Sequence, residues 1–156
     1  MFMTNEIKVE FESLSMNESL ARSIAAVFVS YLNPTLEELA DIKTAVSEAV
    51  TNSIIHGYGN RTGMIQMKCK MHNKTVMIEI VDYGCGIKDV KKAMEPLFTT
   101  RPDLERSGMG FAFMEAFMDE IQVQSKPGKG TTIWMKREIG VERKEEEPIA
   151  FAKGNK

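Results

Sequence analysis

The alternation of apolar and polar residues predicts five strands, one isolated and four in two hairpins. Period-two alternation runs through residues 7–13 (IKVEFES), through 63–72 and 75–84 joined at Asn73-Lys74, and through 121–126 and 131–138 joined by the turn PGKG. Such alternation turns one face of a strand toward a core and the other toward solvent. Two alternating segments joined by a short polar turn are typical of an antiparallel hairpin.

Helical periodicity predicts a first helix over residues 17–32. Ser15 and Glu18 have the spacing of a capping box before it, and Asn33-Pro34 ends it. Its expected core stripe consists of Ile24, Val27 and Phe28.

A second helix is predicted over residues 36–58. Thr35 and Glu38 repeat the capping-box spacing, and Gly57 is the expected stop. Its core stripe is expected to be Leu39, Ile42, Val46, Ala49 and Val50. A third helix follows at 110–120, after an irregular stretch at 83–110 with room for one short helix. A long irregular segment inside a compact domain is usually functional.

This order of elements predicts an α+β fold. We expect a two-layer sandwich in which helices cover one face of a mixed, mostly antiparallel sheet. Residues 1–140 are expected to form a single domain, and the polar residues 141–156 a disordered tail.

Composition argues against several classes of function but does not identify one. The 156 residues are 43% hydrophobic and 27% charged, as in soluble globular proteins, and the net charge of -2 gives no basic field for nucleic acid. No apolar run is long enough to cross a membrane, and the N-terminus lacks the pattern of a signal peptide. The two cysteines lack CxxC spacing and the two histidines are far apart, which argues against a disulfide scaffold or a zinc site. We expect a cytoplasmic protein with reduced thiols and no direct contact with membrane or nucleic acid.

Four short motifs are candidates for a site, and each also has an ordinary structural explanation. Glu48 and Asn52 are one helical turn apart and share a face, which could be simply solvated. In VDYGCGI, Asp82 ends a strand and two glycines then allow close backbone approach. RSGMGF places Gly108 and Gly110 where a helix begins, so its free N–H groups could bind an anion. GKGTT is a hairpin turn in which Thr131 or Thr132 could also contact a ligand.

The motifs together are far more specific than any one of them. Their order resembles that of the ATP-binding fold shared by DNA gyrase, the Hsp90 chaperone, sensor histidine kinases and MutL, and the resemblance spans residues 7–138. EAVTNSIIHGY, PLFTTRPDLERSGMGF and the NESLAR helix are most similar to one branch, the sporulation anti-sigma factors that are also serine kinases.

The resemblance implies ATP and Mg²⁺ as cofactors and assigns roles to residues. Asn52 would be the Mg²⁺ ligand, Glu48 the general base, and Asp82 the acceptor for the adenine amino group, which guanine lacks at that position. Gly84 and Gly86 would form the pocket floor. Residues 95–107 would form a lid with Thr99, Thr100, Arg106 and Ser107 near the phosphates; Gly108 and Gly110 would cradle them, with Thr131 beside the nucleotide. For His56, at the helix end, a structural role is expected.

The resemblance also implies protein partners. They are a sigma factor, which the chain would inhibit, and an anti-anti-sigma factor, whose serine it would phosphorylate. Arg22 is the candidate partner contact, and the alternating edge at 7–13 is consistent with a homodimer. The alternatives are the ATP-binding core of a histidine kinase, which would need a phosphorylated histidine on a separate helical hairpin, and a binding module with structural ATP. A methyltransferase fits less well, because Lys88 replaces the third glycine of its cofactor loop and a hairpin precedes that loop.

Overall fold

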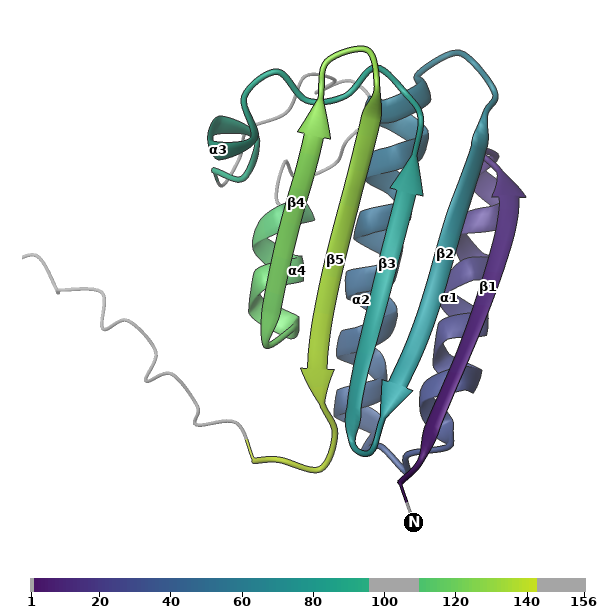
Figure 1. Ribbon diagram of the computed structural model, residues 1–156, viewed down its shortest axis with the longest axis vertical. Coiled ribbons are helices and arrows are strands. Elements are labelled where there is room, and N and C mark those ends of the chain that lie inside the picture. Colours follow the sequence, from purple (N-terminus) through teal and green to yellow (C-terminus); the bar gives the residue numbers. More distant parts are fainter. Residues whose placement is uncertain (1, 96–109, 143–156) are drawn as a thin grey trace, which may run out of the picture.

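Five strands form one antiparallel sheet in the order β1-β2-β3-β5-β4 in the computed structural model, which describes residues 2–95 and 110–142 (Figure 1). The elements are β1 (Thr4–Glu12), α1 (Ser15–Ser30), α2 (Leu36–Asn52), the π-helix η1 (Ser53–Tyr58), β2 (Met64–His72), β3 (Thr75–Asp82), α3 (Val90–Ala93), α4 (Gly110–Phe117), β4 (Glu120–Lys126) and β5 (Gly130–Glu138). Helices α1, α2 and α4 lie against the same face of the sheet. The predicted two-layer α+β sandwich is confirmed, and all four strand pairings are antiparallel, so the expected mixed pairing does not occur in the described residues.

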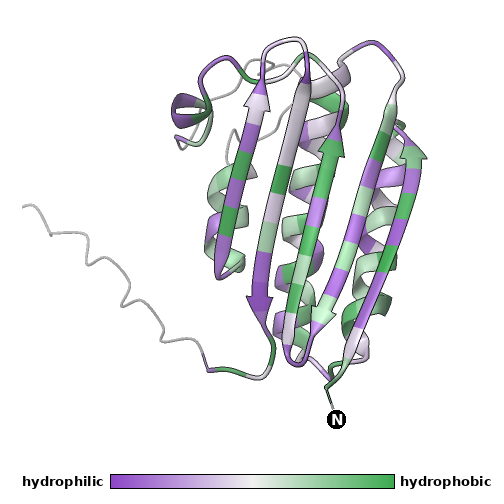
Figure 2. Cartoon of the chain, viewed as in Figure 1, coloured by the Kyte–Doolittle hydropathy of each residue, from purple (hydrophilic) through white to green (hydrophobic). Residues whose placement is uncertain are grey.

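The core lies between the sheet and the helices. On β3, Val76, Ile78 and Ile80 are fully buried on the helix side, and the intervening residues are half-buried on the open face. Figure 2 shows this alternation of hydrophobic and hydrophilic residues along the strands. The turn at Asn73-Lys74 joins β2 to β3 as predicted, and Asn73 takes a positive φ of 54° there.

Helix α1 differs from its prediction in its cap and in its buried face. Leu14 is the N-cap residue, and its apolar side chain cannot make a capping bond. The predicted capping box does not form, and the Glu18 carboxylate instead accepts a hydrogen bond from Ser47 on α2. Val27 is 64% exposed, so it is not part of the core stripe. The buried positions of α1 are Ala21, Ala25, Phe28 and Val29.

Helix α2 begins as predicted but ends differently. Thr35 and Glu38 form a complete capping box, with Thr35 Oγ1 accepting from the Glu38 N–H at 3.1 Å and the Glu38 carboxylate accepting from the Thr35 N–H at 2.8 Å. After Asn52 the α-helix continues as the wider π-helix η1. This helix ends at Tyr58, and the next residue, Gly59, has a positive φ of 60°. The predicted stop at Gly57 is therefore wrong. Gly57 is buried inside η1.

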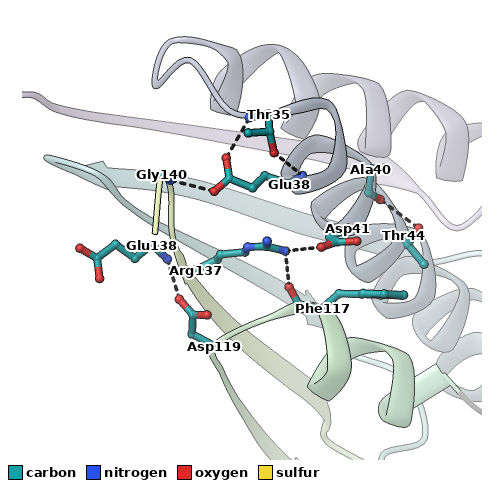
Figure 3. Close-up of polar contacts among 10 residues, drawn as sticks. All are labelled: Thr35, Glu38, Ala40, Asp41, Thr44, Phe117, Asp119, Arg137, Glu138 and Gly140. Atoms are coloured by element: carbon teal, nitrogen blue, oxygen red, sulfur yellow. Dashed lines mark hydrogen bonds and ion pairs between the residues drawn. The ribbon is translucent and has the colours of Figure 1, made fainter. Parts of the chain in front are cut away.

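A polar cluster joins the helices to the sheet at the start of α2, and we call Glu38, Asp41 and Arg137 the far-end cluster. The buried Arg137 donates to Asp41 Oδ2 at 2.8 Å and to the Phe117 carbonyl at 2.7 Å (Figure 3). Glu38 Oε1 accepts from the Gly140 N–H at 2.7 Å. The cluster thereby ties the end of β5 to α2 and to the end of α4.

Candidate functional site

Three segments that are distant in sequence meet at the other end of the sheet. They are the C-terminal end of α2 with η1, the C-terminal end of β3, and the turn between β4 and β5 (Figure 1). The pairing of Asp82 with Thr131 places β3 and β5 side by side there. Most of the predicted site residues that the structure describes lie on these segments.

The π-helix η1 brings a hydroxyl group against the carboxylate of β3. Ser53, its first residue, donates from Oγ to Asp82 Oδ2 at 2.8 Å. Gly57, one turn later, packs so closely that a Cβ added there would lie 2.9 Å from Asp82 Oδ1. Single π-turns inside helices occur frequently at functional sites. Here the wider turn directs both Ser53 and Gly57 toward Asp82.

Asp82 is a buried carboxylate held by several donors. Only 2% of the residue is exposed, and Oδ1 accepts from the Gly84 N–H at 2.9 Å. Thr131 is the partner of Asp82 in the β3–β5 ladder. Burial raises the pKa of Asp82, and the hydrogen bonds from Gly84 and Ser53 only partly offset that rise. The site thus holds a strongly desolvated acid close to the strand end.

The two predicted glycines permit close backbone packing. A Cβ on Gly84 would lie 2.1 Å from the Gly57 carbonyl oxygen, so only glycine lets the end of β3 approach η1. Gly86 takes a positive φ of 73°, and a Cβ there would lie 2.1 Å from the Lys126 carbonyl. Both positions therefore allow close approach of the backbone, as the motif VDYGCGI suggested.

The Ser125 hydroxyl on β4 makes several hydrogen bonds at the same end of the sheet. Its Oγ donates to the Gly130 carbonyl at 3.0 Å and lies 2.7 Å from Thr131 Oγ1, and it accepts from the Ile87 N–H at 2.7 Å. It thereby holds the segment after Gly86 against the β4–β5 hairpin. Thr131, which was predicted, is 4% exposed in this arrangement.

Tyr58 braces the junction between η1, β2 and β3. Its hydroxyl donates to the Met64 carbonyl at 2.5 Å and accepts from the Tyr83 N–H at 2.9 Å. Burial raises the pKa of this phenol, so it stays neutral across the physiological range. Neither Tyr58, Ser125 nor Ser53 was singled out from the sequence, because each acts through contacts between separate elements.

A cavity of about 250 Å³ opens at η1 and the segment after β3. It is lined by Ile55, His56, Gly57, Tyr58, Gly59, Arg61 and Cys85. Cys85 is exposed, and its thiol contacts the His56 carbonyl oxygen at 2.9 Å. The cavity shares Gly57 with the Asp82 environment, whereas Glu48, Asn52 and Asp82 themselves lie outside its lining.

Glu48 and Asn52 lie one turn apart on α2, and both are half-buried. Asn52 directly precedes Ser53, so the amide lies next to the residue that bonds Asp82. The described residues contain no group of three His, Cys, Asp or Glu arranged to hold a metal ion. An amide oxygen can still bind Mg²⁺ that takes its other ligands from phosphates and water. The donor set is therefore suited to a metal–nucleotide complex.

Several other predicted positions can be placed only in part. Gly110 is the first residue of α4. Thr99, Thr100, Arg106, Ser107 and Gly108, and most of the expected lid at 95–107, lie outside the described residues. No helix in the described ranges is long and apolar enough to span a membrane.

Arg22 lies on α1, away from this end-of-sheet site. Its Nε is 3.8 Å from Glu18 Oε1, and 39% of its side chain is exposed. Since Glu18 also accepts from Ser47, the arginine lies on the flank of α1 that faces α2. It remains accessible to a partner.

Comparison with known proteins places this arrangement in a family. The family model described as "Histidine kinase-like ATPase domain" matches residues 11–137. The chain is 57% identical over 136 residues to the anti-sigma F factor of Clostridium novyi, covering 86% of this chain and 95% of that protein. It is 54% identical over 140 residues to the anti-sigma F factor of Thermoanaerobacter sp., covering 90% of this chain and 98% of the relative.

A solved structure has the same fold at low sequence identity. The RsbU and RsbW domains of Rv1364c from Mycobacterium tuberculosis align with a TM-score of 0.63 and 18% identity, covering 86% of this chain and 32% of that one. The resemblance drawn from the sequence motifs is thereby confirmed at the level of family and fold. This chain belongs to the anti-sigma F factor family and has the histidine kinase-like ATPase fold.

Proposed function

We propose that this protein is an anti-sigma factor that inhibits a sporulation sigma factor and is also an ATP-dependent protein serine kinase for an anti-anti-sigma factor. The observation that supports the proposal is the hydrogen bond from Ser53, which directly follows Asn52 at the end of α2, to Asp82 at the end of β3, in a chain whose relatives are anti-sigma F factors. Residues 1–140 would form the kinase domain. The cytoplasm would be its place of action.

Nucleotide selection would rest on Asp82. An ionised carboxylate accepts a hydrogen bond from the amino group of adenine and repels the carbonyl oxygen that guanine presents instead. Gly84 and Gly86 would form the pocket floor, where the absence of a Cβ lets neighbouring backbone segments pack closely. ATP would therefore be preferred over GTP.

Phosphoryl transfer would use the acid and amide of α2. ATP supplies the phosphoryl group, and a Mg²⁺ ion neutralises charge on its phosphates. Asn52 would hold this cation through its amide oxygen without adding negative charge. Glu48, one turn away, would accept the proton of the attacking serine hydroxyl. Both side chains come from a regular helix, so their relative position is rigid.

Both proposed partners are proteins, and Arg22 is the proposed contact on α1. A partly exposed arginine next to a carboxylate can exchange that ion pair for one with a partner. We also propose a homodimer. β1 is an edge strand, and α1 next to it exposes Met16, Leu20, Val27 and Tyr31. An apolar surface beside an open strand edge is suited to association with a second copy.

A labelling experiment tests the kinase proposal. The purified chain is incubated with ATP labelled at the γ-phosphate, Mg²⁺, a candidate sigma factor and a candidate anti-anti-sigma factor. Acid-stable label on a serine of the anti-anti-sigma factor is the expected result, and it should be lost with Glu48→Gln. Acid-labile label on this chain would instead indicate a histidine kinase. Binding of ATP without transfer to any protein would indicate a nucleotide-dependent binding module.

A further inference from the structure

Ser53 makes a contact that the proposed function does not use. It is 1% exposed at the first position of η1, and its hydroxyl donates to Asp82 Oδ2 at 2.8 Å. A buried serine on a helix often bonds to its own helix, as Thr44 does to the Ala40 carbonyl at 3.0 Å. The hydroxyl of Ser53 instead reaches across to the strand residue proposed to read the base.

We infer that Ser53 is a positioning residue for base recognition, which fixes the Asp82 carboxylate as a hydrogen-bond acceptor for the exocyclic amino group of adenine. The inference rests on the proposed function, because it assumes that Asp82 contacts the base. It concerns a residue that neither binds the phosphates nor takes part in phosphoryl transfer.

The hydrogen-bond inventory of Asp82 supports this role. An ionised carboxylate can accept about four hydrogen bonds. The Gly84 N–H and the Ser53 hydroxyl supply two, so acceptor positions remain for a ligand. The Gly84 donor is a backbone group and survives most substitutions. The Ser53 donor is a side chain, so it can be removed without changing the backbone.

Ser53 also favours the charge state that reading an amino group requires. Burial raises the pKa of Asp82, and the Ser53 hydroxyl is one of the donors that oppose the rise. A protonated carboxyl would present an O–H toward the amine, where two donors would meet. The loss of Ser53 should therefore raise the pKa of Asp82 further and shift the acid limit of ATP binding to higher pH.

Other groups near Asp82 do not account for such a shift. Tyr58 on η1 has a raised pKa and stays neutral, Thr131 on β5 is uncharged, and Tyr83 follows Asp82 on its own chain segment. His56 and Cys85 line the neighbouring cavity. They are present in wild type and variant alike, so they do not distinguish the two proteins.

The test measures nucleotide binding by calorimetry for wild type, Ser53→Ala and the matched control Thr44→Ala, from about pH 5.5 to about pH 8. Ser53→Ala should weaken ATP binding roughly 3- to 10-fold at neutral pH, the usual effect of one hydrogen bond to a charged group. Its affinity should also begin to fall at higher pH than that of wild type. Thr44→Ala should match wild type in both respects. Ser53→Cys keeps the size of the side chain and weakens the donor, so its ATP affinity should lie between those of wild type and Ser53→Ala.

Purine riboside triphosphate, which lacks the amino group, separates positioning from a merely structural effect. Its affinity should be the same for wild type and Ser53→Ala. An equal loss for both nucleotides, or a loss for ATP with an unshifted pH profile, would show that Ser53 only supports packing and would overturn the inference. So would Ser53→Ala with the affinity and pH profile of Thr44→Ala. Wild type that binds no ATP would contradict the proposed function itself, and the inference with it.

Discussion

At the scale of single residues, Asp82 is the position where the exchange of one oxygen for an NH₂ group should most affect ATP binding. Asp82→Asn turns one acceptor oxygen into an NH₂ donor in a site where Ser53 and Gly84 already donate. We expect ATP binding to weaken by about 2–3 kcal/mol, from a lost charge-assisted bond and mismatched donors. Calorimetry measures this, with Asp89→Asn at the exposed cap of α3 as a control. Unchanged ATP affinity would remove Asp82 from the base site.

Substitutions at Glu48 and at Asn52 should impair different steps, phosphoryl transfer and Mg-ATP binding respectively. Glu48→Gln keeps the shape, so Mg-ATP and the sigma factor should bind nearly normally while phosphoryl transfer slows by ~10²–10⁴-fold. Asn52→Ala removes the proposed cation ligand, so Mg-ATP binding itself should weaken. Nucleotide affinity and single-turnover phosphorylation, measured for both variants, separate the two roles. A Glu48→Gln protein that phosphorylates its partner at the wild-type rate would disprove the proposed base.

Arg22 should matter for partners and not for nucleotide. Arg22→Glu reverses the charge at the proposed contact and adds repulsion with Glu18 one turn earlier, which costs only a few tenths of a kcal/mol in the isolated helix. We expect weaker binding of both the sigma factor and the anti-anti-sigma factor with normal ATP affinity. Lys70→Glu, an exposed charge reversal on β2, is the control. Pull-downs in which both partners bind Arg22→Glu like wild type would place the contact face elsewhere.

The sequence reveals residues whose role follows from their neighbours in the chain. Asp82, Gly84 and Gly86 could be found because a carboxylate and two glycines stand together after a strand. Ser53 could not, since its partner lies 29 residues away and only the π-turn directs its hydroxyl there. Ser125 was missed for the same reason, because it bonds Ile87 across 38 residues.

At the scale of elements, the two expected capping boxes show what spacing can and cannot predict. Thr35 and Glu38 form the box because the Glu38 side chain has local backbone partners and Arg137 nearby. Glu18 has the same spacing from Ser15, yet it bonds Ser47 on the neighbouring helix and pairs with Arg22. A tertiary contact therefore replaced the local one, and the helix begins after Leu14 without a side-chain cap.

The far-end cluster should make stability depend on pH through Glu38. Burial raises the pKa of this carboxyl, but backbone N–H donors from Thr35 and Gly140 and the charge of Arg137 outweigh burial, so the net pKa is lowered below 4.5. A lowered folded-state pKa gives stability that is present above the unfolded-state pKa and is lost as pH falls through the folded-state value. Glu38→Gln should therefore lower the free energy of unfolding at neutral pH by roughly 1–2 kcal/mol. It should also make that free energy less dependent on pH in the acid range.

Thermal unfolding between about pH 3 and about pH 7 measures this dependence. The control is Glu37→Gln, an exposed neighbour in the same first turn. Parallel curves for Glu38→Gln and wild type across the acid range would show that the carboxylate charge contributes nothing there.

At the scale of the whole molecule, local patterns predicted the strands and both hairpins but not how the hairpins join. The pairing of β3 with β5 connects segments separated by the irregular stretch and α4, and no local signal specifies it. Val27 shows a related limit of the hydrophobic pattern. An apolar residue on a helix can face a core or solvent, and the pattern predicted the core side for Val27, which is exposed.

The exposure of Val27 motivates the last prediction, which concerns the proposed homodimer. Met16, Leu20, Val27 and Tyr31 lie on one side of α1, next to the edge strand β1, and Val27 is 64% exposed. Val27→Asp would bury an unpaired charge if a second copy covers this side, at a cost of several kcal/mol to association. Sedimentation velocity should show a dimer for wild type, a monomer for Val27→Asp, and a dimer for Val141→Asp, an exposed apolar control after β5. Because the change lies far from η1, ATP affinity should stay normal. A Val27→Asp protein that sediments as a dimer would exclude this side of α1 as the interface, and a monomeric wild type would contradict the dimer altogether.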